Sequence, residues 1–359
     1  MNIQSLELTD FRNYQNVEIS FDPGTNVLFG DNAQGKTNIL EAIYLCATTK
    51  SHKGSKDKEI VNFDSEEGHI RAHIMKDGMD EQLDMHLRKN KTKIIAVNGR
   101  KITKAAEILG LLNVVFFSPE DLSIVKNGPY ERRRFVDMEL CQLDNFYLYN
   151  LSNYNKIINQ RNVLLKELSY NNDLRETLHI WDAQLLSYGS KIMERRRLFT
   201  EQMNEILEDI HYHLSGNKEK IVMEYDPNVK EEEYEEKLLS SQDRDIRLKQ
   251  SNVGPHRDDF VFYINGTDVR KFGSQGQQRT VALSLKLAEI ELVKKITKDT
   301  PVLLLDDVLS ELDSNRQKYL LQSIGNIQTI ITCTGLDEFV ENNFRINKLL
   351  KVNDGNVSE

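Results

Sequence analysis

Residues 30–37 combine glycine, lysine and threonine at a spacing that is typical of phosphate binding. After the apolar residues 27–29 and before the helix-like residues 38–43, the chain reads Gly30-Asp31-Asn32-Ala33-Gln34-Gly35-Lys36-Thr37. In such a strand–loop–helix, glycines let backbone N–H groups close around phosphate oxygens, and the helix N-terminus adds a favourable dipole. We expect Lys36 to neutralise phosphate charge and Thr37 to offer its hydroxyl to Mg²⁺. The alternative is a chance glycine turn, which the flanking strand and helix patterns disfavour.

Two carboxylates follow a second apolar run, residues 302–305. Four consecutive apolar residues predict a strand that is buried on both faces, and Asp306 and Asp307 stand where this strand ends. We expect Asp306 to hold Mg²⁺. Asp307 and Lys36 are then the catalytic candidates, with Asp307 polarising the attacking water. The alternative for Asp307 is a helix N-cap before Leu309.

A third glycine-bearing segment opens a long helical pattern. It reads Phe272-Gly273-Ser274-Gln275-Gly276-Gln277-Gln278-Arg279. Ser274 and Gly276 leave the N-terminal amides of the helix uncovered, which favours an anion site. The segment is similar to the signature of ABC-type ATPases, in which such a helix binds a γ-phosphate. The alternative, a simple helix cap, is disfavoured by the phosphate loop and by residues 310–313 (Ser-Glu-Leu-Asp).

Strand-like segments at both ends of the chain must position these residues. Short runs of β-branched and aromatic residues with turn signals predict strands over residues 1–11, 16–20, 25–29, 68–75, 81–87, 93–97, 114–117, 260–264, 301–305 and 329–332. Between these two groups the spacing becomes helical. The pattern predicts one α/β domain that is interrupted in sequence by a helical arm.

The arm is predicted as an antiparallel helical hairpin. Residues 143–168 and 174–210 have apolar residues at helical spacing, with a polar break at residues 169–173. The second helix would reach about 55 Å at 1.5 Å per residue. Its apolar spacings are mostly four and three, as in a coiled-coil seam, with Arg195 at the one polar seam position. Arg195 and its neighbours Arg196 and Arg197 are expected on the helix surface or facing a protein partner.

Composition narrows the classes of protein that this chain can be. Its 359 residues include 47 Lys plus Arg and 56 Asp plus Glu, which gives a net charge of −9. No apolar run approaches the about 20 residues of a membrane helix, and residues 1–11 alternate like a strand instead of a signal peptide. Three distant cysteines, Cys46, Cys141 and Cys333, indicate neither a disulfide framework nor a zinc site. We expect a protein of the reducing cytoplasm with no membrane partner.

Positive charge is segregated despite the acidic total. Residues 85–106 contain seven basic residues and no acidic one: Arg88, Lys89, Lys91, Lys93, Arg100, Lys101 and Lys104. Lys53 and Lys56 belong to a second basic cluster, residues 50–58, and residues 132–134 form a third. Such density favours contact with DNA phosphates without reading of sequence; the alternative is a solvated hairpin face. No base-stacking aromatic residue is evident nearby, so backbone or junction shape is the expected target.

Several strings together resemble the RecF family of SMC-class ATPases. They are residues 8–14 (LTDFRNY), 50–52 (KSH), 117–122 (FSPEDL), 253–259 (VGPHRDD), 273–277 (GSQGQ) and 305–313 (LDDVLSELD). The resemblance implies an ABC/SMC-type P-loop ATPase head (lobe I) with a helical, coiled-coil-like lobe II. Lobe I is expected at residues 1–118 and 299–359. Lobe II is expected at residues 119–298, with its arm at residues 130–215.

The resemblance also implies a recombination mediator that binds ATP, Mg²⁺ and single-stranded, gapped or junction DNA. ATP would be sandwiched in a homodimer between residues 30–37 of one copy and Ser274, Gly276 and Gln277 of the other. Arg12 would lie near the phosphates. RecR is the implied partner, with RecO and RecA downstream in DNA repair, replication and the SOS response. Turnover would be that of a weak, DNA-stimulated ATPase used as a switch, because the second acid is aspartate where ABC proteins usually have glutamate.

Two other functional classes use the same nucleotide motifs. One is an ATPase subunit of a transporter or another soluble ABC-type ATPase. The transporter subunit would need a membrane partner, which neither the basic hairpin nor the arm indicates. A small-molecule kinase would leave the signature-like helix unexplained. The residue that senses the γ-phosphate is open, because Thr332-Cys333-Thr334 stands where many transporters have a histidine.

Overall fold

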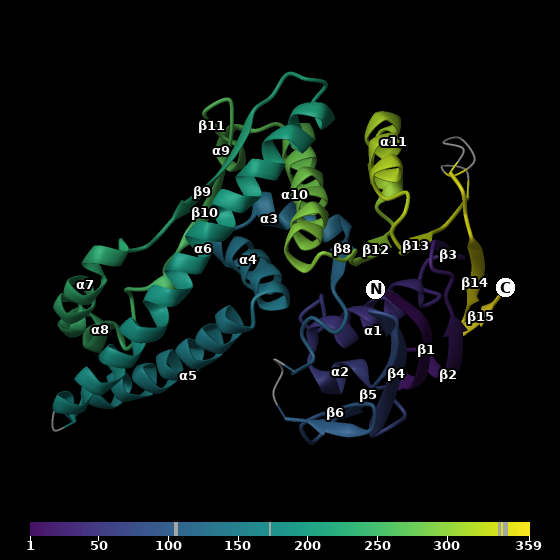
Figure 1. Cartoon of the computed structure of the whole chain (residues 1–359). Coiled ribbons are helices and arrows are strands. Elements are labelled where there is room, and N and C mark those ends of the chain that lie inside the picture. Colours follow the sequence, from purple (N-terminus) through teal and green to yellow (C-terminus); the bar gives the residue numbers. More distant parts are fainter. Residues whose placement is uncertain (104–106, 172–173, 337–338, 340–343) are drawn as a thin grey trace. The chain divides into compact units, whose positions relative to one another are not determined.

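The computed structural model describes residues 1–103, 107–171, 174–336, 339 and 344–359. Its chain divides into two compact units, of which unit 1 comprises Met1–Asp121 with Leu285–Glu359 and unit 2 comprises Leu122–Ser284 (Figure 1). The lobe boundaries expected from the sequence stay a prediction. Lys104 of the basic stretch and residues 172–173 of the predicted polar break lie outside the described residues.

Unit 1 contains a six-stranded antiparallel sheet in the order β2-β1-β4-β5-β6-β7. Its strands are β1 (Asn2–Phe11), β2 (Tyr14–Ser20), β4 (Glu67–Lys76), β5 (Met79–Arg88), β6 (Ile94–Val97) and β7 (Arg100–Ile102). Alternating apolar residues point to one face, such as Leu6 and Leu8 of β1. A bulge between Ile3 and Ser5 explains why β1 has two residues between its buried Ile3 and Leu6.

The second sheet of unit 1 is mostly parallel, in the order β15-β14-β3-β13-β12-β8. Its strands are β3 (Thr25–Phe29), β8 (Val114–Phe117), β12 (Val302–Asp306), β13 (Thr329–Cys333), β14 (Lys348–Asn353) and β15 (Asn356–Ser358). Nearly every residue of β3, β8, β12 and β13 is buried, as parallel strands covered on both faces require. β15 pairs antiparallel with β14 at the edge.

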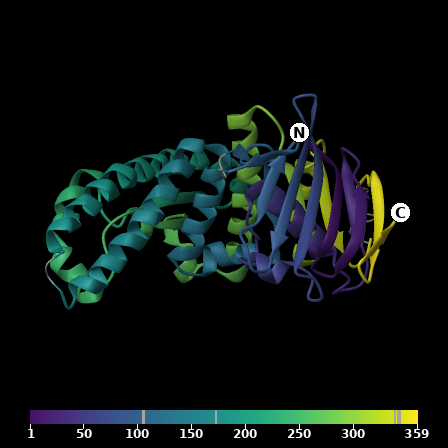
Figure 2. The same ribbon diagram turned by 90° about the horizontal axis from the view of Figure 1, so that it is seen from below.

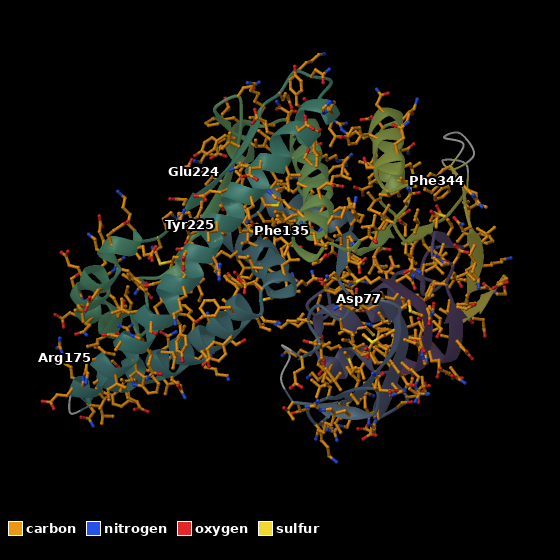
Figure 3. All side chains as sticks on the ribbon, in the orientation of Figure 1. Asp77, Phe135, Arg175, Glu224, Tyr225 and Phe344 are labelled. Atoms are coloured by element: carbon orange, nitrogen blue, oxygen red, sulfur yellow. The ribbon has the colours of Figure 1, made fainter. Side chains whose placement is uncertain are left out.

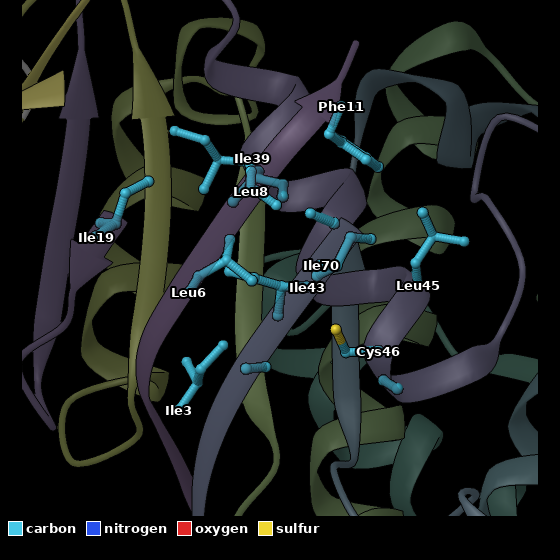
Figure 4. Packing of buried hydrophobic residues seen from close by; sticks show 14 of the residues in the cluster. Ile3, Leu6, Leu8, Phe11, Ile19, Ile39, Ile43, Leu45, Cys46 and Ile70 are labelled. Atoms are coloured by element: carbon cyan, nitrogen blue, oxygen red, sulfur yellow. The ribbon is translucent and has the colours of Figure 1, made fainter. Parts of the chain in front are cut away.

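Helix α1 (Lys36–Thr48) packs against strands of both sheets and completes the core of unit 1. Its buried Ile39 and Ile43 join Leu6 and Ile70 of the antiparallel sheet and Leu304 of the parallel sheet in one apolar cluster (Figure 4). Unit 1 also contains α2 (Asp57–Ile60) and α11 (Ser314–Ser323). Because α1 is fixed by this core, the loop that precedes it is held at a defined edge of the parallel sheet.

Unit 2 contains the predicted helical hairpin. Its helices are α3 (Leu122–Lys126), α4 (Pro129–Leu143), α5 (Asn145–Leu168), α6 (Leu178–Leu214), α7 (Tyr234–Ser240), α8 (Gln242–Leu248) and α9 (Val269–Phe272). Helices α5 and α6 lie side by side, which confirms the hairpin (Figure 2). A small sheet has the order β11-β10-β9, with β9 (Ile221–Asp226), β10 (Asp259–Ile264) and β11 (Thr267–Asp268). Helix α10 (Gln275–Thr297) begins in unit 2 and continues into unit 1.

The interior of the arm differs from a coiled-coil seam because it contains charges. Arg161 of α5 is fully buried and donates to Asp182 of α6 and to Asp245 of α8, both at 2.7 Å. Toward the end of α6 the buried positions are Leu207 and His211, whereas a heptad seam continued through the predicted helix would place the apolar residues Ile206 and Ile210 there. A straight helix with 3.6 residues per turn produces this drift away from a heptad.

The expectations about the arginine clusters are wrong for Arg196 and for Arg132 and Arg133, whereas Arg197 is exposed as expected. Arg196 is 1% exposed and donates to Asp137 and Asp258, each at 2.8 Å, so it faces neither solvent nor a partner. Arg132 is 3% exposed and pairs with Asp259 of β10, while Arg133 donates to the carbonyl oxygen of Asp258. The sequence cannot reveal this pairing, because the partner acids are distant along the chain.

Among the described residues, no helix combines the length and the apolar character needed to span a bilayer.

Candidate nucleotide-binding site

The loop at residues 30–35 joins β3 to α1, and its two glycines are required by the way the chain packs around them. Gly30 has a φ of 154°, and a Cβ there would approach the carbonyl oxygen of Val352 to 2.3 Å. Gly35 has a φ of 112°, and its Cβ would meet the Asn13 side chain at 2.6 Å. Asp31, Asn32 and Ala33 are exposed at the tip of the loop. Glycine is thus needed at both ends of the loop by the packing of this chain.

Helix α1 begins without a side-chain cap. Its N-cap residue is Gly35, which has no side chain that could accept a hydrogen bond from the first turn. The first N–H groups of a helix have no intrahelical acceptor, so those of α1 can bind an anion. Lys36 is 8% exposed, and its ammonium donates to the carbonyl oxygens of Gly30 at 2.6 Å and Asp31 at 2.8 Å. A cation therefore lies within the loop.

The two acidic residues at the end of β12 lie at the same sheet edge. The Oδ1 atom of Asp306 accepts hydrogen bonds from the hydroxyls of Thr37 and Thr332, each at 2.8 Å. The neighbouring Asp307 has a φ of 52°, a left-handed conformation that is uncommon for a non-glycine residue. Its N–H donates to Thr332 Oγ1 at 3.0 Å. The short 3-10 helix Leu309–Glu311 has Val308 as its N-cap residue, so the alternative role of Asp307 as the N-cap before Leu309 is wrong.

Arg12 lies beside α1 and is held by protein groups. Its guanidinium donates to both carboxylate oxygens of the buried Glu41 at 2.8 Å, to Ser55 and to the carbonyl oxygen of Glu59. Burial acts to raise the pKa of Glu41, but the hydrogen bonds from Arg12 and Ser51 and the Arg12 charge hold it below its ordinary value. In this structure Arg12 fixes the segment at residues 51–59 to α1.

Contacts that the sequence analysis missed also hold the loop. Asn13 donates to the carbonyl oxygen of Gln34 at 3.0 Å and accepts from the Asn38 side chain at 2.8 Å. The Asp354 N–H, in the turn between β14 and β15, donates to Gln34 Oε1 at 2.6 Å. Asn13 belongs to the string at residues 8–14. The turn has an Asp-Gly signal, the one sign in the sequence that could have revealed it.

The signature-like segment lies in unit 2 and begins α10. Ser274 Oγ accepts from the N–H of Gln277 at 3.2 Å, and Gln277 Oε1 accepts from the N–H of Ser274 at 2.9 Å, which forms a capping box. Ser274 and Gly276 are exposed. A Cβ at Gly276 would meet nothing nearer than 3.9 Å, so the described chain does not require glycine there. Ser274 and Gln277 therefore do cap the helix, as the alternative interpretation expected. The cap still leaves the surface at Ser274 and Gly276 accessible.

The structure brings the two basic clusters of unit 1 together. Lys93 donates to Asp57 and to the carbonyl oxygen of Thr49, which joins the hairpin between β5 and β6 to residues 50–58. Lys53, Lys56, Lys91, Arg100 and Lys101 are exposed. The remaining two make local contacts: Arg88 donates to the carbonyl oxygen of Thr92 and Lys89 to that of Phe63.

Acids from neighbouring segments accompany these clusters, which the sequence analysis did not foresee. Glu67 lies opposite Arg88 in the sheet register, and Glu66 accepts from Asn90. Acidic residues of the chain itself therefore compensate part of this positive charge. The inference that a polyanion must compensate it is weakened accordingly. An aromatic residue is nevertheless present, because Phe63 is 92% exposed on the turn that Lys89 contacts.

Known proteins resemble this chain over its full length. The family model described as "RecF/RecN/SMC N terminal domain" matches residues 2–358. The "DNA replication and repair protein RecF" of Lachnoclostridium phytofermentans is 60% identical over 359 residues, covering 100% of both chains. That of Agathobacter rectalis is 58% identical, covering 99% of both.

Solved structures agree with these relatives. The "Structure of the recombination mediator protein RecF-ATPrS in RecFOR pathway" has a TM-score of 0.92 and 36% identity, covering 99% of this chain and 97% of that chain. An Smc head domain from Pyrococcus furiosus has a TM-score of 0.57 at 19% identity, with 99% and 95% covered, and shows the shared fold. The expected ABC/SMC-type head with a helical arm is thereby confirmed. The chain belongs to the RecF family of SMC-type proteins.

Proposed function

We propose that this chain is an ATP-dependent DNA-binding recombination mediator whose nucleotide site is built around residues 30–37. The observation that carries the proposal is the 2.8 Å contact between Thr37 and Asp306, because it joins the phosphate loop to the acid that ends β12. The donor set fits the cofactor: a hydroxyl and a carboxylate suit Mg²⁺, which commonly keeps several waters. Bound Mg²⁺ would neutralise charge on the β- and γ-phosphates of ATP.

The residues of the loop have separate roles in this proposal. The N–H groups of Gly30 to Thr37 cradle the phosphates, and Lys36 gives up its carbonyl contacts to approach phosphate oxygens. Asp307 orients the attacking water, with the shorter reach of aspartate favouring slow turnover. Arg12 supports the site through Glu41 and approaches the phosphates from the edge of α1.

Ser274, Gly276 and Gln277 contact the ATP of a second copy, so that nucleotide is enclosed in a homodimer. Two features support this: α10 begins at an accessible surface, and Gly276 has space around it that the chain itself does not use. Lys36→Met should abolish ATP-driven dimers by removing nucleotide binding. Ser274→Arg should leave nucleotide binding intact and remove dimerisation, as measured by sedimentation with a non-hydrolysable analogue.

DNA is the proposed second ligand, bound at the joined basic clusters of unit 1. Phosphates contact the exposed side chains of Lys53, Lys56, Lys91, Arg100 and Lys101. Three further residues, Arg88, Lys89 and Lys93, give up their contacts within the chain to bind phosphates as well. A salt titration with gapped, single-stranded and duplex DNA, with and without ATP, tests this. Affinity that responds to neither ATP nor DNA type would contradict the mediator function.

RecR is the proposed direct partner, with RecO and RecA acting downstream in repair, replication and the SOS response, in the cytoplasm near the nucleoid. The support is the likeness to a solved RecF whose title places it in the RecFOR pathway. The chain would be a weak, DNA-stimulated ATPase used as a switch. The alternatives of a transporter subunit and a small-molecule kinase lose their basis with the family assignment.

A further inference from the structure

A chain of side-chain hydrogen bonds joins the beginning of α10 to the end of the arm helix α6. Gln277 donates from Nε2 to Glu219 Oε1 at 2.8 Å, and Glu219 Oε2 lies 3.3 Å from His211 Nε2. His211 Nδ1 lies 2.9 Å from Ser284 Oγ. All four residues belong to unit 2.

The network attaches α6 to α10 at two levels. Gln277 and Ser284 are seven residues apart, which places them on the same face of α10. His211 and Ser284 are fully buried, whereas the side chain of Glu219 is 21% exposed. The N–H of Glu219 also donates to Ser215 Oγ at 3.1 Å, just beyond the end of α6. Glu219 is therefore held from both sides.

Gln277 has two roles that depend on each other. Its Oε1 accepts from the N–H of Ser274, and its Nε2 is oriented by Glu219. The capping box holds this amide through its Oε1, and the hydrogen bond from Nε2 to Glu219 holds its other end. Glu219 thus fixes which way Gln277 and the adjoining first turn of α10 face.

We propose that Glu219 is a positioning residue for the signature: through Gln277 it holds the beginning of α10 against the end of α6, so that Ser274 is presented in one orientation to the nucleotide of a second copy. This rests on the proposed ATP-sandwiched dimer. The end of α6 then helps to hold the dimerisation surface in place. A conformational change in the arm would therefore alter the orientation of the signature.

The donors and acceptors make a conservative variant informative. The Ser284 hydroxyl donates to the Thr280 carbonyl oxygen at 2.7 Å, so His211 donates from Nδ1 and its Nε2 faces Glu219. A hydrogen bond there needs one further proton, on the imidazole or on the carboxyl. Glutamine at position 219 supplies that hydrogen from its amide, and its carbonyl oxygen still accepts from Gln277.

The test compares Glu219→Ala and Glu219→Gln with the wild type. Glu224→Ala is the matched control, since Glu224 is an exposed glutamate on β9 (Figure 3). Hydrogen–deuterium exchange of residues 275–284 is measured without nucleotide, and dimerisation is measured by sedimentation with a non-hydrolysable ATP analogue. We expect Glu219→Ala to exchange faster in this segment and to dimerise about tenfold more weakly. Glu219→Gln and Glu224→Ala should match the wild type.

Two results would overturn the positioning role: wild-type exchange and dimerisation in Glu219→Ala, or a Glu219→Gln protein as impaired as Glu219→Ala. If the wild type binds nucleotide but never dimerises, while Glu219→Ala still exchanges faster, the dimer function fails and the positioning contact stands. The two failures are therefore distinguishable.

Discussion

The phosphate loop and the signature segment are both glycine-bearing beginnings of helices, but the chain holds them differently. Around the loop, a Cβ at Gly30 or Gly35 would collide with Val352 or Asn13 within 2.6 Å. At Gly276 the nearest atom would be 3.9 Å away. Internal packing therefore explains the glycines of the loop and leaves that of the signature unexplained. The contrast indicates that Gly276 makes room for something outside the chain, which we propose is the nucleotide of a second copy.

The largest expected effect is on the closely packed side of this comparison. Gly30→Ala should lower the free energy of unfolding by about 4 kcal/mol, because a backbone collision and a positive φ act together. Gly78→Ala is the control, since Gly78 has a φ of 77° and nothing within 4 Å. Urea unfolding of both variants checks this. Equal destabilisation would show that the Val352 contact is unimportant.

The unit that contains the signature should lose stability in mild acid. Burial lowers the pKa of His256 to about 4, from an ordinary 6.5. The unfolded chain then binds the proton first, so stability is lost as pH falls from about 6.5 to about 4, by about 3 kcal/mol at most. Trp181, the one tryptophan, lies in α6 and reports on unit 2. Urea unfolding followed by its fluorescence should show this loss, and His256→Gln should flatten it; an unchanged slope would contradict the assignment.

Removing the cation from the loop should nearly eliminate nucleotide binding. Lys36→Met should weaken ATP about 100-fold, since a charge-assisted contact to phosphate disappears. Calorimetric titration measures the affinity, with Lys53→Met as an exposed control. Unchanged affinity in Lys36→Met would place the nucleotide elsewhere.

On the open side, Gly276→Ala should separate folding from assembly. Alanine in the first turn of α10 should preserve stability or raise it by up to about 1 kcal/mol. Dimerisation with a non-hydrolysable analogue should weaken about tenfold, because the Cβ occupies the space left for the second copy's nucleotide. If the variant dimerises like the wild type, Gly276 does not make room for the nucleotide of a second copy.

The smallest expected effect concerns the exposed aromatic side chain beside the basic hairpin. Phe63→Ala should weaken single-stranded DNA about fivefold, as expected when one base loses a stacking partner. Met79→Ala, 60% exposed in the same unit, is the control. Fluorescence anisotropy measures both affinities, and equal binding would leave Phe63 without a role in DNA contact.

Much of the fold follows from local sequence pattern. Alternation and apolar runs predicted most strands of both large sheets, and helical spacing predicted α5 and α6, because each pattern lies within one continuous segment. β7, β9, β11 and the β14–β15 hairpin were missed, although Asp354-Gly355 is a tight-turn signal. That hairpin matters most for the site, since it contacts Gln34.

The parts of the site that the sequence did not show are contacts between distant residues. From the sequence, Arg196 is expected on the surface, because its partner Asp258 is 62 residues away along the chain. The basic stretch at residues 85–106 is acid-free in sequence, but Glu67 faces it across the sheet. Composition of a segment therefore describes its own charge and says little about the charges that the fold brings to it.

The central claim is that residues 30–37 and the signature are two halves of one site supplied by two copies of the chain. The most direct measurement is sedimentation of Lys36→Met and Ser274→Arg, each alone and then mixed, with a non-hydrolysable ATP analogue. Each variant alone should stay monomeric, and the mixture should form a heterodimer, because one intact loop can meet one intact signature. A mixture that remains monomeric, or variants that dimerise alone, would contradict the claim.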